Sequence, residues 1–262
     1  MNYAKKSLGQ NYLIDLNIIK KIVDLTEVYN KNILEIGPGK GALTEQILKN
    51  KPKSLILIEK DNLLAQELKL KYQNNKKVIV YNEDVLKFNF EKKLKKNSII
   101  FGNLPYNISS QILARMVKFR KWPPNYSNLV LMFQKEVADR IIAKYNTPNY
   151  GRLSILSNWK LNIKKICDIK PGSFSPRPKI DSSLLIFSPK KYFYNIKSKN
   201  LEIITRTFFN QRRKMLKKPY NKVFKGNENI SKKLKIDLNL RPQNLDFETY
   251  YKLTNEYEKL RS

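Results

Sequence analysis

The sequence predicts an α/β protein: a doubly wound, mainly parallel sheet followed by a small C-terminal all-helical domain. Five short apolar runs alternate with amphipathic helical segments as far as Tyr145. A glycine-rich turn directly follows the first run. Beyond Ser188–Lys191 the strand pattern is lost. We therefore expect two domains, residues 1–190 and 191–262.

Composition and charge point to a polyanionic partner. The 262 residues include 52 Lys and Arg against 22 Asp and Glu, a formal net charge of +30. The Lys and Arg side chains would displace counterions from the phosphates of such a partner. Biased nucleotide composition of the source genome is the alternative cause. Histidine is absent, which excludes mechanisms and metal sites built on an imidazole.

The single cysteine, Cys167, excludes an intrachain disulfide and a thiolate metal cluster. We interpret it as a buried apolar residue and not as a nucleophile. Apolar runs stay well below the ~18 residues of a membrane span, and the N-terminus has no signal-peptide core. The sequence thus predicts a soluble, cytoplasmic protein.

A basic arm, Lys5–Leu13, opens the chain, and Asp15 is placed to cap an amphipathic helix that runs to Leu25. The arm could close over a ligand. Composition alone favours a loose tail, because chain termini are usually poorly ordered.

The first strand, Asn32–Ile36, runs into a G-x-G-x-G turn with glycine at 37, 39 and 41, and a helix starts at Ala42. This spacing differs from the dinucleotide pattern G-x-G-x-x-G. Glu35 would repel a pyrophosphate but suits a cationic or amino-bearing ligand. The turn therefore favours S-adenosylmethionine over a nicotinamide dinucleotide. A turn with no ligand is the alternative.

A second strand, Ser54–Ile58, ends at Glu59, which lies 22 positions after Gly37. That separation is close to the ~20 residues at which an acid reaches the ribose hydroxyls in such folds. One carboxylate can accept from both hydroxyls. A helix is expected over Leu63–Tyr72.

The third strand, Val78–Tyr81, leads to Asp84. Its carboxylate could accept the adenine amino group of the cofactor. A solvated loop acid is the alternative, because Asp is common in turns.

The fourth strand, Ile99–Phe101, delivers Asn103, Pro105 and Tyr106 to the edge where such sheets bind ligands. These residue types suit an exocyclic base amine. The Asn103 side-chain oxygen and a backbone carbonyl can each accept one amino hydrogen, which aims the nitrogen lone pair outward while the aromatic ring stacks on the base. An ordinary Asn-Pro turn is the alternative.

Three further elements complete the predicted sheet layer. We expect a helix over Ile108–Phe119, a fifth strand over Leu129–Phe133 and a helix from Gln134 to Tyr145. A helix passing into a strand is expected over Leu153–Leu161, followed by a strand over Ile163–Ile169.

The stretch Gly172–Ser182 is too rich in Pro, Ser and charge to form regular structure, and the strand Ser183–Phe187 follows it. It could present Phe174 to a flipped base and place Arg177 and Lys179 on phosphate. A rigid surface connector is the alternative.

The C-terminal segment is expected to be helical. One helix should bury Leu201, Ile204, Phe208 and Met215, with Arg206, Arg212, Arg213 and Lys214 on its other side. Arg212–Lys218 is the densest basic cluster and our best phosphate-binding candidate, against a solvated charged face. Another helix should begin at Asn229, and a last one should span Phe247–Leu260, with Phe247, Tyr250, Tyr251 and Leu253 as core candidates.

Taken together, these segments resemble the family of bacterial small-subunit ribosomal RNA adenine N6-dimethyltransferases. The resemblance spans almost the whole chain and rests on five motifs in this order: Leu8–Leu13, Glu35–Gly39, Gly102–Asn107, Ser173–Lys179 and Phe208–Lys214. The glycine-rich loop alone would be a weak signal.

The resemblance implies a Rossmann-like sheet in residues 1–190 that uses S-adenosylmethionine as methyl donor. The cofactor would be bound by Asn11, Leu13, Gly37, Glu59, Asp84 and Asn103. Asn103, Pro105 and Tyr106 would carry the catalysis.

The implied target is a pair of adjacent adenosines in a hairpin near the 3′ end of 16S rRNA, each methylated twice within a 30S subunit precursor. The helical domain, 191–262, would help to dock that precursor. We expect a monomer with no membrane or DNA partner.

Two other functions stay open on sequence alone. A resistance-type 23S rRNA adenine N6-methylase shares the Asn-Leu-Pro-Tyr arrangement, and a non-catalytic ribosome assembly factor could keep the fold and bind RNA. A DNA adenine methylase fits less well, since those enzymes favour an acid or Asn followed directly by two prolines.

Overall fold

The computed structural model describes residues 10–261. They form two compact units. The first contains the chain as far as Ala138 together with Asn162–Pro189, and the second contains Asp139–Leu161 and the chain from Lys190 onward. This division differs from the predicted domains 1–190 and 191–262, because Asp139–Leu161 packs with the C-terminal helices.

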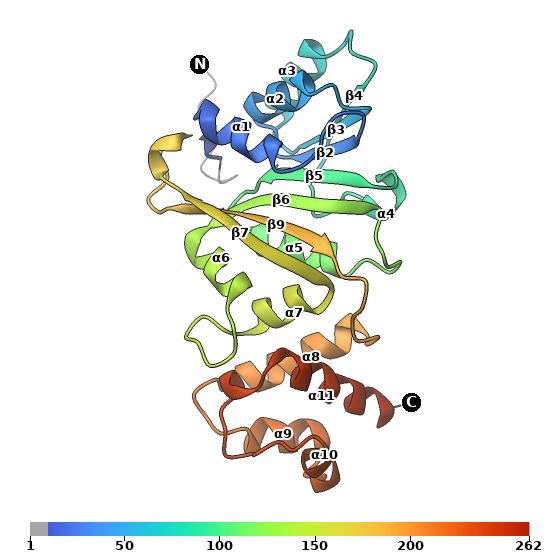
Figure 1. Cartoon of the computed structure of the whole chain (residues 1–262), viewed down its shortest axis with the longest axis vertical. Helices are drawn as coiled ribbons and strands as arrows, with labels where there is room; N and C mark the ends of the chain where they lie inside the picture. Colours follow the sequence, from blue (N-terminus) through green and yellow to red (C-terminus); the bar gives the residue numbers. More distant parts are fainter. Residues whose placement is uncertain (1–9, 262) are drawn as a thin grey trace. The chain divides into compact units, whose positions relative to one another are not determined.

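The first unit is built on a seven-stranded sheet with the strand order β4-β3-β2-β5-β6-β9-β7 (Figure 1). Its strands are β2 (Asn32–Ile36), β3 (Ser54–Glu59), β4 (Val78–Asn82), β5 (Ser98–Asn103), β6 (Tyr126–Gln134), β7 (Leu161–Ile169) and β9 (Ser182–Pro189). The strands from β4 to β6 pair in parallel, and β9 is antiparallel to β6. The doubly wound, mainly parallel sheet that the sequence predicts is confirmed.

Helices lie on both faces of this sheet. They are α1 (Leu16–Asp24), α2 (Ala42–Lys49), α3 (Asn62–Lys71), α4 (Phe90–Lys93) and α5 (Ser109–Val117). The Asp15 side chain accepts from the backbone N–H groups of Asn17 and Ile18, which confirms the predicted cap of α1. Crossovers through α2 and α3 run along the sheet in one direction and the crossover through α5 in the other. Right-handed connections therefore place α5 on the opposite face.

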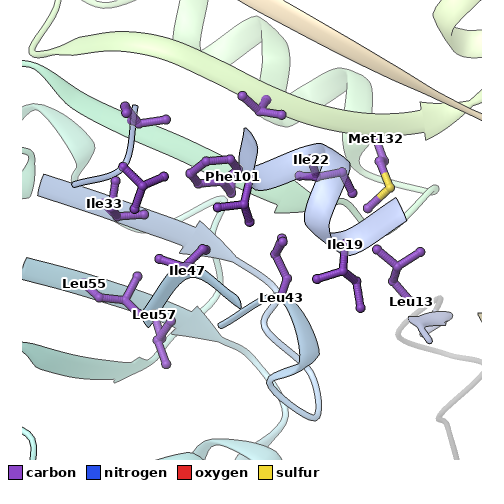
Figure 2. Packing of buried hydrophobic residues seen from close by; sticks show 14 of the residues in the cluster. Leu13, Ile19, Ile22, Ile33, Leu43, Ile47, Leu55, Leu57, Phe101 and Met132 are labelled. Carbon is purple, nitrogen blue, oxygen red and sulfur yellow. The ribbon is translucent and has the colours of Figure 1, made fainter. Parts of the chain in front are cut away.

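A continuous apolar core fills the face covered by α1 and α2. Ile33, Leu57 and Phe101 of the strands pack there against Ile22 of α1 and Leu43 of α2 (Figure 2). Successive strand residues alternate between the two faces, so the same strands that form this core also supply a second buried layer. Burial on both faces makes the sheet a rigid platform for the residues that follow its strands.

A two-stranded sheet joins segments far apart in the sequence. β1 (Tyr12–Leu13) pairs antiparallel with β8 (Phe174–Ser175), directly after the short helix η2 (Pro171–Ser173). We predicted that Gly172–Ser182 would lack regular structure, and this was wrong for these residues. The two paired strands lie about 160 positions apart in the sequence, so no local sequence pattern predicts that they pair.

The second unit is helical. It contains the second half of α6 (Lys135–Ile142), together with α7 (Arg152–Lys160), α8 (Ser198–Phe209), α9 (Lys217–Phe224), α10 (Glu228–Lys233), η3 (Pro242–Asn244) and α11 (Phe247–Lys259). The Tyr150 ring packs edge-on against Phe209 and Phe247, and the Tyr251 hydroxyl donates to the Ile155 carbonyl. These contacts tie α7 to α8 and α11.

One predicted helix was too long. α8 ends at Phe209, and Met215, expected in its core face, is 58 % exposed. Leu216 is buried instead, where its N–H donates to the Leu240 carbonyl. Helix α9 was not predicted, because Pro219 and the neighbouring lysines interrupt the apolar periodicity that would indicate a helix. The helices expected from Asn229 and Phe247 are confirmed as α10 and α11.

Candidate functional site

The carboxyl ends of β2 and β5 lie side by side at the centre of the sheet. From β2 the chain moves to β3 and β4, and it then returns to β5 on the other side of β2. Such a reversal leaves a crevice in which open α/β sheets bind ligands. A cavity of about 410 Å³ lies here, a volume typical of small-molecule sites.

Every residue predicted to bind the cofactor or to act in catalysis lines this cavity. They are Asn11, Leu13, Gly37, Glu59, Asp84, Asn103, Pro105 and Tyr106. Sequence reasoning missed the apolar residues Val85, Leu86 and Leu104. Apolar residues next to a strand usually belong to the hydrophobic core. The sequence therefore has no signal that would assign these three residues to a binding cavity.

The glycine-rich turn adopts a backbone that other residues would strain. Gly37, Gly39 and Gly41 have φ angles of 68°, 57° and 84°. A Cβ atom at Gly39 would lie 2.7 Å from Cδ1 of Tyr12. Glycine at 39 is therefore needed for the turn and for the close approach of the Tyr12 ring to it.

Glu59 is a fixed acceptor at the end of β3. The Gly39 N–H donates to its Oε2 at 3.1 Å, and the Asp61 N–H donates to its Oε1 at 2.8 Å. Burial raises the pKa of the Glu59 carboxyl. Each oxygen keeps a further lone pair, so a ribose diol can donate to this carboxylate.

Asp84 is held as a charged group. Lys60 Nζ lies 2.8 Å from its Oδ2, and the Leu86 N–H donates to Oδ1 at 2.9 Å. The Lys60 hydrogen bond keeps the pKa of Asp84 below its usual value. Arg115 fixes the same connection by donating to the carbonyls of Val85 and Phe88 at 2.6 and 2.9 Å. Neither Lys60 nor Arg115 was predicted.

The Asn103 carboxamide is oriented by the N-terminal arm. Its Nδ2 donates to the Asn11 carbonyl at 2.7 Å. This bond commits the amide nitrogen and leaves Oδ1 to accept from a ligand in the cavity. The Pro105 carbonyl accepts from the Ile108 N–H at 3.1 Å and keeps a second lone pair. Two oxygens are thus available to one amino group.

The Tyr106 ring is anchored at its far end. Its hydroxyl lies 2.7 Å from Oγ of Ser182, a fully buried residue at the start of β9. Burial raises the pKa of the Tyr106 phenol, so it stays neutral. The hydrogen bond fixes the plane in which the ring can stack on a base.

We expect Ser182→Ala to lower the methyl transfer that the family resemblance implies, measured in a single turnover, by about fivefold, because one hydrogen bond of ~1 kcal/mol then no longer orients the ring. Tyr106→Phe should have a similar effect, and the double variant should be no slower than either single one. Ser183→Ala is the matched control, since this buried neighbour bonds Asp168 instead. Losses that multiply in the double variant would contradict this positioning role.

Glu35 is buried below the glycine-rich turn and lines the same cavity. Its Oε2 accepts from the Thr44 hydroxyl at 2.6 Å. Burial raises the pKa of Glu35 to about 8, and the Thr44 hydrogen bond opposes this. A cation in the cavity would favour the ionised form, so this acid suits a positively charged ligand.

Glu35 should make the cofactor-free protein less stable as pH rises. The unfolded chain loses this proton near pH 4.5, whereas the folded protein keeps it to about pH 8. The free energy of unfolding should fall across that window by up to ~1.4 kcal/mol per pH unit, and Glu35→Gln should flatten the fall. Denaturant titrations between pH 5 and 8 measure this. Parallel curves for the two proteins would contradict it.

Hydrogen bonds hold residues 10–14 of the N-terminal arm in place, contrary to the expected loose tail. Tyr12 donates to Gln10 Oε1 at 2.8 Å, and Gln10 Nε2 donates to Asp61 at 3.2 Å. The Ile14 N–H donates to the Ser173 carbonyl at 2.9 Å. The arm therefore covers the cavity from one side. The predicted arm residues 5–9 lie outside the described part of the chain.

Phe174 is not placed as predicted. Its side chain is only 3 % exposed and packs in the apolar core with Leu13 and Ile19. The cause is the β1–β8 pairing, which turns the ring inward, so it does not present itself to a base. Arg177 and Lys179 are exposed, as phosphate contacts require.

The predicted basic cluster of the second unit divides into two parts. Arg212 is half-buried and donates to the carbonyls of Thr147 and Pro148. Arg213 and Lys214 are exposed along a broad depression in the same unit. Arg212 thus supports the fold of this unit, whereas its two neighbours can contact a partner.

Residues 10–261 contain no group of three or more His, Cys, Asp or Glu suited to a metal ion. None of their helices combines the length and apolar character that crossing a membrane requires.

Comparison with known proteins decides the family. A family model described as "Ribosomal RNA adenine dimethylase" matches residues 1–259. The chain belongs to this family. It is therefore an rRNA adenine dimethyltransferase, and its methyl donor is S-adenosylmethionine.

Similar curated proteins and solved structures span nearly the whole dimethyltransferase. "Ribosomal RNA small subunit methyltransferase A" of Pelagibacter ubique (strain HTCC1062) is 58 % identical over 98 % of both chains. The protein of the same name from Wolbachia sp. subsp. Drosophila simulans (strain wRi) is 42 % identical, covering 98 % of this chain and 94 % of that one.

A dimethyladenosine transferase from Plasmodium falciparum superposes with a TM-score of 0.78 at 28 % identity, covering 94 % of this chain and 97 % of that one. The 23S rRNA methyltransferase ErmE has a TM-score of 0.69 at 20 % identity, covering 95 % and 100 %, and shares the fold.

Proposed function

We propose that this dimethyltransferase modifies N6 of two adjacent adenosines in a hairpin near the 3′ end of small-subunit rRNA, within a precursor of the small ribosomal subunit. Relatives that are 58 % and 42 % identical over almost the full length carry the name of small-subunit methyltransferases. We also propose a cytoplasmic monomer.

The cavity residues fit the cofactor. Glu59 offers acceptors for two ribose hydroxyls, Asp84 offers a charged acceptor for an adenine amino group, and Glu35 suits a positive charge. Val85 and Leu86 add an apolar wall for the adenine ring. When bound, S-adenosylmethionine supplies an electrophilic methyl group.

The single observation that carries the mechanism is the fixed Asn103 carboxamide. With Nδ2 bound to the Asn11 carbonyl, Oδ1 can accept one N6 hydrogen, and the Pro105 carbonyl can accept the other. These bonds draw the N6 lone pair out of the ring and aim it at the donor. Tyr106 holds the base plane by stacking. Near-attack geometry of this kind supplies most of the rate gain.

No side-chain base is required, since the nitrogen loses its proton only after the new bond forms. The chain contains no histidine that could act as one. Its residues need only position the amine and exclude competing acceptors.

We assign the first unit to catalysis and the second to docking of the RNA. Exposed Arg213 and Lys214 in the second unit, and Arg177 and Lys179 in the first, support contacts with phosphate. Phe174 is left out of this assignment because of its burial.

The deciding experiment is methyl transfer to small ribosomal subunits that lack the modification. Reverse-transcription stops should map two adjacent adenosines near the 3′ end of the small-subunit rRNA. Stops on 23S rRNA in parallel reactions with large subunits would favour the other rRNA target. Absence of any transfer would favour a non-catalytic assembly factor.

A further inference from the structure

The two edges of the parallel sheet differ sharply in charge. Five connections precede β2, β3, β4, β5 and β6, and they comprise residues 25–31, 50–53, 72–77, 94–97 and 118–125. They contain ten Lys and Arg against a single acid, Glu27. Because parallel strands all begin at the same edge, these connections gather at the side of the sheet remote from the cavity.

The opposite edge is neutral. The connections that follow β2, β3, β4 and β5 hold three lysines and three acids. A genome that merely favours lysine codons would enrich both edges alike. The asymmetry therefore requires another explanation, and a binding surface provides one.

The five basic connections form one continuous strip. The Lys53 N–H donates to the Lys31 carbonyl at 2.8 Å, and the Leu55 N–H donates to the Lys77 carbonyl at 2.8 Å. On the other side, the Asn125 side chain donates to the Leu94 carbonyl at 2.9 Å. With neighbouring strands ~4.8 Å apart, the strip is about 20 Å long.

The cations of this strip face solvent. Its exposed members are Lys51, Lys53, Lys76, Lys77, Lys95, Lys96, Arg120 and Lys121. The ring of Tyr29, in the first of these connections, is 66 % exposed. Cations spaced along a line with an exposed aromatic ring suit a phosphate backbone with an accessible base.

We propose that this strip, the amino edge of the sheet, is a second RNA-binding surface of the enzyme. It binds a backbone segment of the ribosomal particle other than the one that delivers the adenosines to the cavity. Cofactor and catalytic residues occupy the carboxyl edge, so the enzyme contacts its RNA at two opposite sides of the first unit. For its partner, this inference rests on the proposed function.

The test compares two triple variants of the full chain. The edge variant is Lys51→Gln, Lys53→Gln and Lys96→Gln, and the control is Lys20→Gln, Lys21→Gln and Lys164→Gln, which removes three exposed lysines from α1 and β7. Binding to unmodified small ribosomal subunits is measured between 50 and about 200 mM salt. Calorimetry with S-adenosylmethionine and thermal melts confirm that both variants fold.

We expect the edge variant to bind about tenfold or more weakly and the control to stay within about twofold of the unmodified chain. The slope of log affinity against log salt should fall by about 2 to 3 for the edge variant, since each phosphate contact contributes ~0.7 to 0.9. Lys→Arg changes at the same three edge positions keep the charge and should preserve binding. If the triple glutamine variant fails to fold, Lys53→Gln alone replaces it and should lower the salt slope by about 0.7 to 0.9.

Three results would overturn the proposal. Equal losses in both glutamine variants would indicate a general charge effect, and no loss in either would leave the edge without a role. Loss on intact particles with unchanged binding to naked small-subunit rRNA would identify a ribosomal protein as the partner. Failure of the unmodified enzyme to methylate the particles would refute the proposed function separately, because binding is measured independently.

Discussion

Asn103→Ala should reduce methyl transfer to the background rate while RNA binding stays nearly intact. The side chain supplies Oδ1, the acceptor that aims the N6 lone pair, and the Asn11 bond holds it in place at 2.7 Å. Removing one preorganised polar group from an active site typically costs about 10² to 10³ in rate, and misplacement of the amine adds to this.

Single-turnover transfer of a radiolabelled methyl group to unmodified small subunits measures this loss, and a filter-binding assay measures RNA affinity. Asn107→Ala is the matched control, because this exposed asparagine lies at the rim of the same cavity. It should retain most of the rate. Near-normal transfer by Asn103→Ala would remove Asn103 from the mechanism.

Glu59→Gln should weaken S-adenosylmethionine binding by about 30-fold, or ~2 kcal/mol. The buried carboxylate accepts from the Gly39 and Asp61 N–H groups and has lone pairs left for a ribose diol. An amide replaces one acceptor oxygen with a donor, which then faces another donor. The loss should therefore include both the ribose contact and the shape of the glycine-rich turn.

Isothermal titration calorimetry with the cofactor gives the affinity directly. Glu27→Gln is the control, since it makes the same chemical change at an exposed position outside the cavity. It should bind as the unmodified chain does. Equal affinities for Glu59→Gln and the unmodified chain would refute a cofactor role for Glu59.

Local pattern was enough to predict the sheet and the residues that follow its strands. Apolar runs fixed β2 to β6, and spacing from Gly37 singled out Glu59. Polar residues at strand ends are informative because a parallel sheet brings all of those ends to one edge. For this reason Glu59, Asp84 and Asn103 in the lining of the cavity were predicted from separate short segments, whereas Asn11 and Leu13 came only from the family resemblance.

Contacts between segments that are far apart in the sequence could not be predicted from it. We predicted that Phe174 stacks on a base, because its sequence neighbours are rich in Pro and charged residues. Pairing of β8 with β1 instead buries its ring. We predicted that Arg212 contacts phosphate, but its guanidinium donates a hydrogen bond to the Thr147 carbonyl. In both cases a contact between distant segments decided the role, and no periodicity could have revealed it.

The β1–β8 pair also has a consequence for biosynthesis. Tyr12 pairs with Ser175, so the arm that orients Asn103 lacks its β-sheet partner until about two-thirds of the 262 residues have been translated. At 5–20 residues per second the nascent chain spends roughly ten seconds or more in that state. A ribosome that is still translating this chain therefore carries an active-site arm without its strand pairing, and we expect the arm to reach its final position only after β8 has been made.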